Sequence, residues 1–179
     1  AVAAARASVV GGFVGTSNLE AGLLYGIPTV GTSAHSFTLL HDTEEEAFAA
    51  QVASLGPSTT ILVDTYDIAT GVERAVKAAR AAGGELGAVR LDSGDLVAEA
   101  FKVRAQLDAL GATSTRITVT NDLDEHAIAA LGAAPVDSYG VGTKLVTGSG
   151  RPTAALVYKL VEREGADGTM EEVAKFSSG

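Results

Sequence analysis

Apolar residues along the chain alternate between short runs and longer segments with helical spacing. The short runs at 61–63, 88–91 and 117–119 are rich in branched apolar residues, as expected for the buried strands of a parallel sheet. Between them, the segments 72–79 and 96–110 repeat apolar residues every three or four positions, which predicts amphipathic helices. The order strand, helix, strand, helix is typical of a parallel α/β fold.

Capping and turn residues mark where further elements begin and end. Thr43 precedes the glutamates at 44–46, and this combines a good N-cap with acids that favour the positive end of the helix dipole. The Gly-Pro pair at 56–57 stops that helix. Before it, a short helix is predicted over 19–25 and a short strand over 29–31.

The C-terminal part of the chain has a different pattern, in which two apolar segments flank a turn. Residues 154–161 and 170–176 are predicted strands, and the Gly-Ala-Asp-Gly sequence at 165–168 would join them. The chain is therefore expected to end in a β-hairpin that follows the βα repeats.

Isolated aromatic and histidine residues are interpreted as structural. Phe13, Phe48 and Phe101 are predicted to lie in the core, because each falls in an apolar segment. No motif surrounds His41 or His126, and both are predicted to lie at the surface or at the start of a helix.

Polar side chains follow the predicted strands at regular intervals. Asp64, Asp92 and Asp122 lie 28 and 30 residues apart, which is the length of one βα unit. Parallel strands end at the same edge of a sheet, so the three carboxylates are expected to converge there, where α/β folds place their active sites. Arg90 shares a strand face with Asp92, because side chains two positions apart point the same way. An isolated Arg–Asp pair could equally be a structural ion pair, but the recurrence favours a site.

Composition and charge exclude several classes of function. The chain has 179 residues, with 13 Lys and Arg against 22 Asp and Glu and a formal net charge of −9. No basic cluster stands out, so neither nucleic acid nor an anionic membrane is expected as a partner. Without cysteine there is no disulfide, thiol nucleophile or thiolate metal site. No apolar run approaches a membrane span, and a cytoplasmic protein is expected. Because the chain opens at Ala1 without an initiator Met, an N-terminally truncated fragment is also expected.

The strand-end residues suit a ligand that carries hydroxyls, a phosphate and an acid group. Asp92 and Asp122 could accept hydrogen bonds from sugar hydroxyls, or hold Mg²⁺ directly or through water. Gly140 and Gly142 would let backbone N–H groups approach a phosphate, and the Thr143 hydroxyl would add a donor. The guanidinium of Arg90 is a planar fork suited to a carboxylate or phosphate.

Six motifs in order give the chain a family resemblance. They are Gly-Thr-Ser-Asn-Leu at 15–19, Gly-Thr-Ser-Ala-His-Ser at 31–36, Val-Asp-Thr-Tyr-Asp at 63–67, Arg-Leu-Asp-Ser-Gly-Asp at 90–95, Thr-Asn-Asp-Leu-Asp-Glu at 120–125 and Tyr-Gly-Val-Gly-Thr-Lys-Leu at 139–145. Together they resemble nicotinate phosphoribosyltransferase, a type II phosphoribosyltransferase, from about Gly11 to Val161. The family's upstream Phe-Gly-x-Arg-Arg stretch is absent, which fits a truncated N-terminus.

The resemblance implies a fold, a reaction and partners. The fold would be part of an irregular TIM-like (β/α) barrel over 1–161, with the C-terminal hairpin and extension, 162–179, packed on or next to it. The reaction would join nicotinate to phosphoribosyl pyrophosphate, giving nicotinate mononucleotide and pyrophosphate on the route to NAD. It would require Mg²⁺ and be coupled to ATP hydrolysis through a phosphohistidine. The enzyme would be a homodimer.

The resemblance also assigns roles to individual residues. His35 matches the phosphorylated histidine, and Asp64 matches its orienting carboxylate, expected to hydrogen-bond the ring. Arg90 and Asp92 match residues at the base and ribose, and Asp92 could hold the Mg²⁺ through water. The remaining matches are Asp122 at the ribose, Gly140, Gly142 and Thr143 at the 5′-phosphate, and Thr16 near the site.

Several alternatives remain open from the sequence. The chain could be a non-catalytic nucleotide-binding fragment, or a phosphoribosyltransferase that uses nicotinamide or quinolinate. A type I phosphoribosyltransferase is weakly suggested by the apolar strand at 61–63 and the Thr-Gly pair at 70–71, although the acids are not adjacent. A phosphosugar isomerase or aldolase would need a strand-end Lys or Glu, and Lys144 alone fits that place.

Overall fold

A computed structural model describes residues 1–148, 152–154 and 156–175. The chain divides into two compact units, Ala1–Thr32 and Ser33–Gly179. Within the described residues, no helix combines the length and the apolar character that crossing a lipid bilayer requires.

The first unit consists of two helices around a small core. Helix α1 spans Val2–Val10 and helix α2 spans Leu19–Tyr25, as predicted for the latter. The side chain of Asn18 caps α2 by accepting a hydrogen bond from the Ala21 N–H. The strand predicted over 29–31 is reduced to a single parallel bridge between Thr16 and Thr29, because only one residue of each segment pairs.

The second unit contains a four-stranded parallel sheet in the order β1-β2-β3-β4, which confirms the predicted parallel α/β fold. The strands are β1 (Thr60–Leu62), β2 (Ala88–Leu91), β3 (Arg116–Val119) and β4 (Ser138–Tyr139). In the register of the sheet, Leu62 pairs with Arg90 and Arg90 with Thr118. The residues that follow these positions therefore leave the sheet at one edge, as the spacing of the aspartates predicts.

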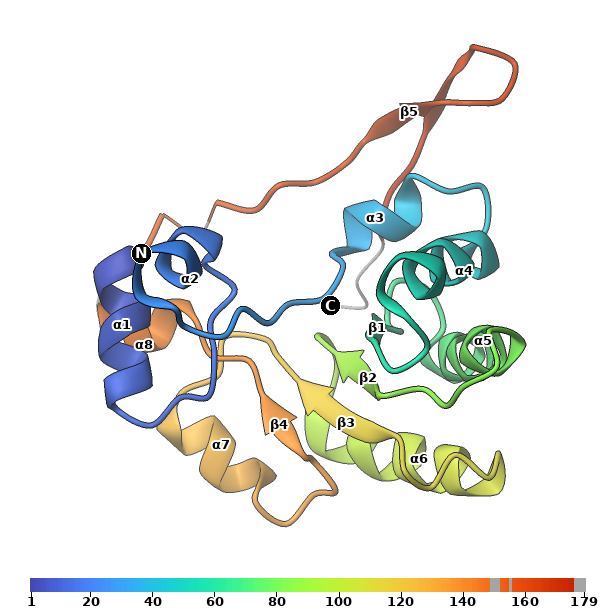
Figure 1. The fold of residues 1–179 in the computed structure, drawn as a ribbon. Coiled ribbons are helices and arrows are strands. Elements are labelled where there is room, and N and C mark those ends of the chain that lie inside the picture. The colour runs from blue at the N-terminus through green and yellow to red at the C-terminus, as the bar shows by residue number, and fades with distance from the viewer. Residues whose placement is uncertain (149–151, 155, 176–179) are drawn as a thin grey trace. The chain divides into compact units, whose positions relative to one another are not determined.

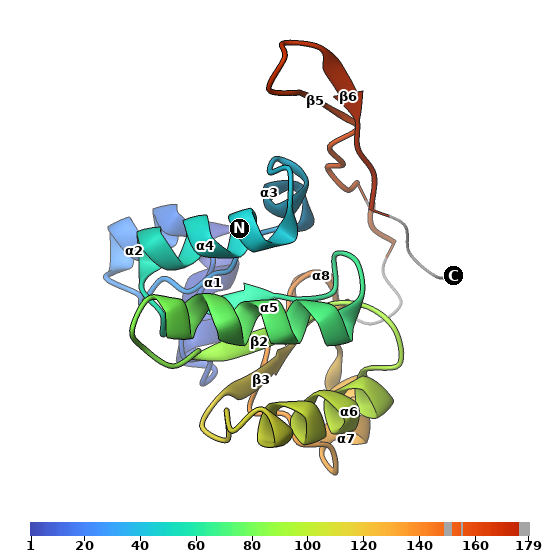
Figure 2. The same ribbon diagram turned by 90° about the vertical axis from the view of Figure 1, so that its right-hand side faces the viewer.

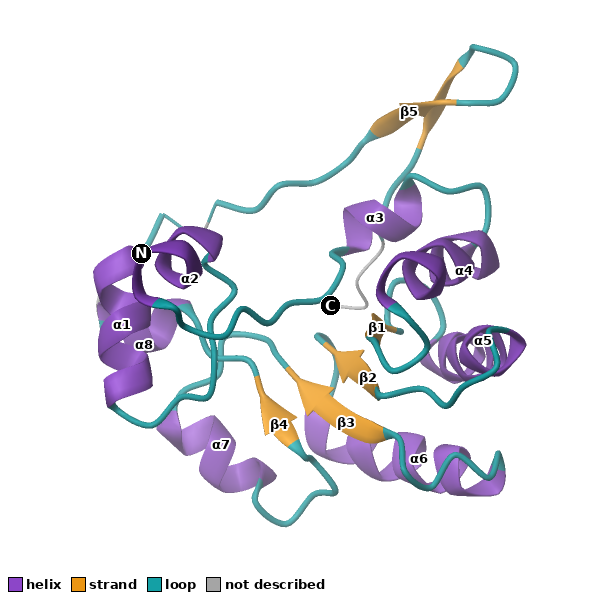
Figure 3. Ribbon diagram, in the orientation of Figure 1, coloured by secondary structure: helices purple, strands orange, loops and turns teal. Residues whose placement is uncertain are grey.

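The helices of this unit are α3 (His35–Leu39), α4 (Glu44–Leu55), α5 (Ile68–Ala81), α6 (Leu96–Ala109), α7 (Glu125–Leu131) and α8 (Thr143–Thr147). Of these, α5, α6 and α7 lie along one side of the curved sheet (Figures 1 and 3). Figure 2 shows α5 and α6 running alongside the strands on that side. The described strands form an open sheet whose edge strands are β1 and β4. The described residues do not form a closed barrel.

The core lies between the sheet and these helices. The largest fully buried side chains include Phe48, Ile61, Leu91, Leu107 and Ile117, so Phe48 is confirmed as a core residue. The predictions for the other two aromatic residues are wrong. Phe13 is 37% exposed, because it lies in a loop after α1 rather than in an element. Phe101 is 53% exposed, because α6 turns Ala100, Val103 and Leu107 inward and leaves position 101 outside.

The C-terminal hairpin is present but shifted along the chain. Strands β5 (Glu162–Glu164) and β6 (Met170–Glu172) pair antiparallel around the predicted turn at 165–168. The prediction of a strand over 154–161 is wrong, because residues 156–161 are irregular and β5 begins only at Glu162. Positions 155 and 176 of the two predicted strands lie outside the described residues. In the register of the hairpin, Arg163 faces Glu171 and forms an ion pair with it.

Candidate functional site

The loops after β1 and β2 are tied together by a buried carboxylate. The Asp64 side chain is 1% exposed, and its Oδ2 accepts hydrogen bonds from the Asp92 N–H at 2.9 Å and from the Ser93 hydroxyl at 2.5 Å. Asp64 Oδ1 is also buried, and no described residue donates a hydrogen bond to it. Asp64 therefore fixes the backbone that carries Asp92 and keeps one acceptor oxygen for another group.

Arg90 is held at the same edge by hydrogen bonds to two other segments and to Asp92 of its own segment. Its Nε donates to the Thr120 hydroxyl at 2.8 Å, its Nη1 to the Ser33 carbonyl at 3.4 Å, and its Nη2 to Asp92 Oδ1 at 2.9 Å. The Thr120 hydroxyl also donates to Asp92 Oδ1. The ion pair between Arg90 and Asp92 therefore exists, and both side chains are partly exposed, at 21% and 29%. An ion pair open to solvent in this way remains reachable by a ligand.

The environment of Asp92 keeps its carboxylate ionised. Burial alone would raise the pKa of Asp92, but interactions with His35, Thr120 and Arg90 outweigh it and hold this pKa well below its usual range. Asp92 is thus a permanent negative charge at neutral pH, able to accept hydrogen bonds or to face a cation.

His35 brings an imidazole to these carboxylates from the first residue of α3. Its Nδ1 lies 3.0 Å from the Thr65 hydroxyl, and its Nε2 lies 3.9 Å from Asp64 Oδ1 and 3.8 Å from Asp92 Oδ2. The expected hydrogen bond between Asp64 and His35 is not formed, because 3.9 Å is too long. Thr65, one position further along the same loop, contacts the ring instead.

A fifth side chain reaches this group from the end of the chain. Lys175 Nζ lies 2.9 Å from His35 Nε2, although the two residues are 140 positions apart. Sequence reasoning missed Lys175, because nothing in the local pattern of residues 170–175 distinguishes it from an exposed lysine. It also missed the contacts of Thr65 and Thr120, for which the positions beside strand-end acids were the available signal.

Two further residues expected at the site are Asp122, in the loop after β3, and Thr16, in the first unit. Asp122 is exposed, and the loop that carries it has positive φ at Asn121 (109°) and Asp122 (43°). Such backbone conformations are costly for residues other than glycine and often mark functional loops. Thr16 belongs to the first unit, where its hydroxyl accepts a hydrogen bond from the Asn18 N–H.

The glycine-rich turn after β4 lies beside Thr120, and its two glycines differ in how closely the protein packs around them. A Cβ added to Gly140 would overlap Thr120 Cγ2, whereas a Cβ added to Gly142 would meet no atom within 4 Å. Thr143 is the first residue of α8. Gly140 is therefore the position where only glycine fits, and it packs on the residue that supports Arg90 and Asp92.

We expect Gly140→Ala to lower the free energy of unfolding by about 1–3 kcal/mol, the usual cost of forcing extra volume into a packed site. Gly31→Ala is the control, with an expected change within about 0.5 kcal/mol, because a Cβ at Gly31 would meet no atom within 4 Å. Urea denaturation of both variants gives the two values. Equal losses would show that the turn does not pack on Thr120 as described.

The His, Asp and Glu side chains of the described residues determine how a metal ion could be held. No group of three or more His, Asp or Glu side chains that could hold a metal ion occurs among the described residues. The carboxylate oxygens at the strand ends instead suit Mg²⁺ in its common protein mode, with one or two carboxylates and the other ligands from water and substrate phosphates.

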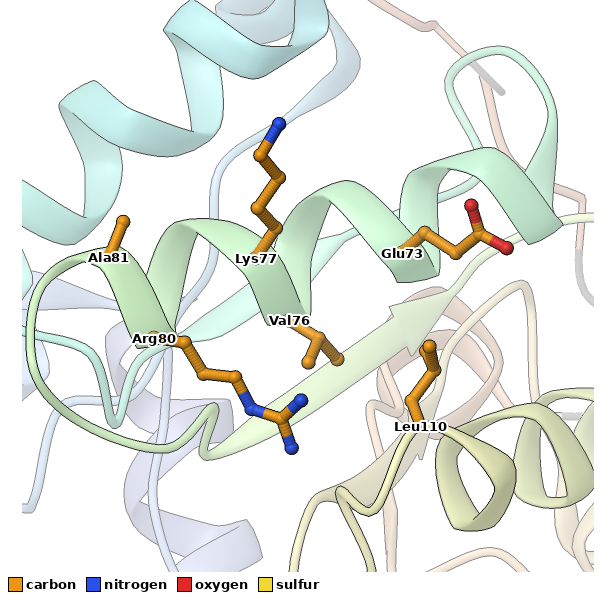
Figure 4. A pocket seen from close by; sticks show the side chains of 6 residues that line it. All are labelled: Glu73, Val76, Lys77, Arg80, Ala81 and Leu110. Atoms are coloured by element: carbon orange, nitrogen blue, oxygen red, sulfur yellow. The ribbon is translucent and has the colours of Figure 1, made fainter.

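An open pocket lies away from the carboxyl ends of the strands. This pocket of about 420 Å³ between α5 and α6 is lined by Glu73, Val76, Lys77, Arg80, Ala81 and Leu110 (Figure 4). None of the residues expected at the site lines this pocket. The strand-end cluster of His35, Asp64, Arg90 and Asp92 is therefore the candidate functional site.

Known proteins resemble this chain in both sequence and fold. The sequence is 60% identical over 173 residues to the nicotinate phosphoribosyltransferase pncB1 of Mycobacterium tuberculosis, covering 92% of this chain and 38% of that protein. It is 41% identical over 179 residues to the nicotinate phosphoribosyltransferase of Bacillus subtilis, covering 97% and 36%. The crystal structure of human nicotinic acid phosphoribosyltransferase matches with a TM-score of 0.65 at 26% identity, covering 76% of this chain and 39% of that one.

No protein-family model matches the sequence. The chain spans less than two fifths of the length of the two curated relatives described. Within that span, both the amino-acid identity and the parallel α/β fold agree with these proteins, and they agree with the resemblance carried by the six motifs. The chain therefore belongs to the nicotinate phosphoribosyltransferase family.

Proposed function

We propose that the intact protein transfers a phosphoribosyl group from phosphoribosyl pyrophosphate to nicotinate, giving nicotinate mononucleotide and pyrophosphate. The observation that carries this proposal is the convergence of His35, Asp64, Arg90 and Asp92 at one sheet edge in a chain 60% identical to a nicotinate phosphoribosyltransferase. The guanidinium of Arg90 and the ionised carboxylates lie at the carboxyl ends of the strands. They suit substrates that carry an acid group and a phosphorylated sugar.

The positions of Arg90 and Asp92 suggest their roles in transfer. The guanidinium of Arg90 is anchored by Thr120 and Asp92, so little side-chain freedom is lost when it pairs with the nicotinate carboxylate. Asp92 Oδ2 is the carboxylate oxygen on the His35 side, and it would accept hydrogen bonds from ribose hydroxyls. A carboxylate beside the ribose also favours the positive charge that develops on the sugar ring as pyrophosphate leaves.

Coupling to ATP hydrolysis through His35 is the second part of the proposal. The bond from Nε2 to the γ-phosphorus would form as the bond from that phosphorus to the β–γ bridging oxygen breaks, with ADP as the leaving group. Nε2 faces the two carboxylates while Nδ1 contacts Thr65, so Nε2 is the nitrogen directed into the site. Later hydrolysis of the phosphohistidine would return the ring to its starting state.

Mg²⁺ fits the donor atoms at this edge. Asp92 would hold it, directly or through water, with substrate phosphates completing the coordination. When bound, Mg²⁺ supplies charge neutralisation to the phosphates. Asp64 Oδ1, buried and without a described donor, is available to orient a water at the same place.

Other assignments rest on family membership. The turn carrying Gly140, Gly142 and Thr143 is proposed to bind the 5′-phosphate, with Asp122 at the ribose and Thr16 near the site. The complete protein is proposed to close the sheet into an irregular barrel and to act as a cytoplasmic homodimer. These proposals concern the intact protein, of whose relatives the chain spans less than two fifths.

The test is the formation of nicotinate mononucleotide from nicotinate, phosphoribosyl pyrophosphate, ATP and Mg²⁺ by the intact protein. We expect nicotinate to be used at least tenfold better than nicotinamide or quinolinate, measured as kcat/KM, because Arg90 recognises one carboxylate. Preference for either competitor would assign the protein to that substrate instead. Mononucleotide binding without turnover by the intact protein would support the non-catalytic alternative.

A further inference from the structure

The contact between Lys175 and His35 has no place in the transfer chemistry described above. Lys175 lies three residues beyond β6, at the end of the hairpin segment, and its Nζ is 2.9 Å from His35 Nε2. We infer that Lys175 is a positioning residue that sets the tautomer of His35 and thereby makes Nε2 the unprotonated nitrogen of the neutral ring.

The donor and acceptor properties of the two groups carry this inference. An ammonium group has protons to donate and no acceptor, so His35 Nε2 must be the acceptor and carry no proton. The proton of the neutral ring then lies on Nδ1, where the Thr65 hydroxyl at 3.0 Å accepts it. Two contacts on opposite sides of the ring therefore specify one tautomer, in the way that a partner on one histidine nitrogen specifies the state of the other.

If Lys175 were absent, the carboxylates around the ring would favour the tautomer that carries its proton on Nε2. Asp64 Oδ1 and Asp92 Oδ2 lie 3.9 and 3.8 Å from Nε2, and neither carboxylate oxygen faces Nδ1. In the absence of a cation, these acceptors would draw a proton onto Nε2, where it could be donated to them after a small shift. The ammonium of Lys175 opposes that tendency.

The hairpin is anchored so that its tail can return to His35. Arg163 of β5 pairs through Nη2 with Asp42 at 2.5 Å and with Glu171 of β6 at 2.9 Å, and its side chain is 13% exposed. Asp42 follows the end of α3, whereas His35 begins that helix. The hairpin segment therefore contacts both ends of α3, through Arg163 at one end and Lys175 at the other.

The functional meaning of this contact rests on the proposed function. If Nε2 attacks the γ-phosphate of ATP, the tautomer with a proton on Nδ1 is the competent neutral form, because the attacking nitrogen must hold its electron pair. The tautomer itself can be measured without substrates. The inference can therefore fail while the proposed function stands, and the reverse also holds.

The experiment is ¹⁵N NMR of the intact protein labelled in histidine, at a pH where the ring is neutral, with the His35 signals assigned from His35→Gln. We expect Nε2 of His35 to show the shift of an unprotonated nitrogen and Nδ1 that of a protonated one. In Lys175→Met the tautomer ratio should change roughly tenfold or more toward a proton on Nε2, because a charge-assisted hydrogen bond is lost. Lys175→Arg should retain the original tautomer, since its guanidinium still donates.

Two controls separate this effect from a general change in charge or folding. Lys159→Met removes an exposed lysine upstream of the hairpin and should leave the ratio unchanged. His41, whose Nδ1 lies 2.8 Å from the Phe37 carbonyl, should keep its signals in every variant if α3 stays folded. An unchanged His35 ratio in Lys175→Met, or an equal change in Lys159→Met, would overturn the inference.

Discussion

Arg90→Ala is expected to lower kcat/KM for nicotinate in the intact protein by roughly 30- to 4,000-fold. Removing one partner of a desolvated charged pair typically costs about 2–5 kcal/mol, and each 1.4 kcal/mol is a factor of ten. The Arg90 side chain is only 21% exposed before a ligand covers it, and hydrogen bonds to Thr120, Ser33 and Asp92 orient it. Its pair with the nicotinate carboxylate would therefore be desolvated in the complex. Steady-state kinetics with nicotinate as the varied substrate measures the loss.

A companion variant distinguishes the planar fork from the charge. Arg90→Lys keeps one positive charge but loses bidentate geometry, so its kcat/KM should lie between those of the original protein and Arg90→Ala. Arg116→Ala is the matched control, because Arg116 lies exposed at the beginning of β3 and therefore at the opposite edge of the sheet. Its kcat/KM should change less than twofold.

Arg90 also supports the fold, and the two roles must be separated. In Arg90→Ala, Asp92 Oδ1 keeps the Thr120 hydroxyl but loses its cation, so part of the effect will appear as reduced stability. The free energy of unfolding should be measured on the same sample, and kinetics compared at a temperature where the variant is folded. A folded variant with unchanged kcat/KM would leave Arg90 a structural residue and remove it from the substrate site.

The strand-end site was predictable because a parallel sheet converts sequence spacing into proximity. Asp64 and Asp92 follow adjacent strands whose register is fixed by the pairing of Leu62 with Arg90, so a spacing of one βα unit places them side by side. Arg90 and Asp92 were expected to share a strand face, and their ion pair confirms it. These relations follow from backbone geometry and need no knowledge of side-chain packing.

The partners of His35 were not predictable in the same way. Its distance from Asp64 depends on how α3 packs, and one position in a loop decides whether Asp64 or Thr65 receives the hydrogen bond. Lys175 reaches the ring because the hairpin that precedes it returns to α3, where Arg163 of β5 pairs with Asp42. Contacts between distant segments of this kind leave no periodic signal in a sequence.

The second large effect is expected at His35. His35→Ala should abolish ATP hydrolysis by the intact protein but leave residual, uncoupled phosphoribosyl transfer, because Arg90 and Asp92 remain in place. With γ-³²P-labelled ATP, the original protein should acquire an acid-labile, base-stable label, as expected for a phosphohistidine, and His35→Ala should acquire none. His126→Ala is the matched control, because the side chain of His126 is 87% exposed and its loss should not affect labelling.

A graded variant then tests how the ring is held. Thr65→Val removes the hydroxyl that lies 3.0 Å from Nδ1 while keeping a branched side chain of similar size in a buried position. The imidazole should remain present but less well oriented, so labelling should become slower by roughly 10- to 100-fold, in the range seen when the residue that orients a histidine is lost. Because the expected role of Thr65 is to hold the ring, transfer without ATP should fall much less. A label that persists in His35→Ala would place the phosphorylated residue elsewhere, and labelling in Thr65→Val at the original rate would show that Nδ1 needs no anchor.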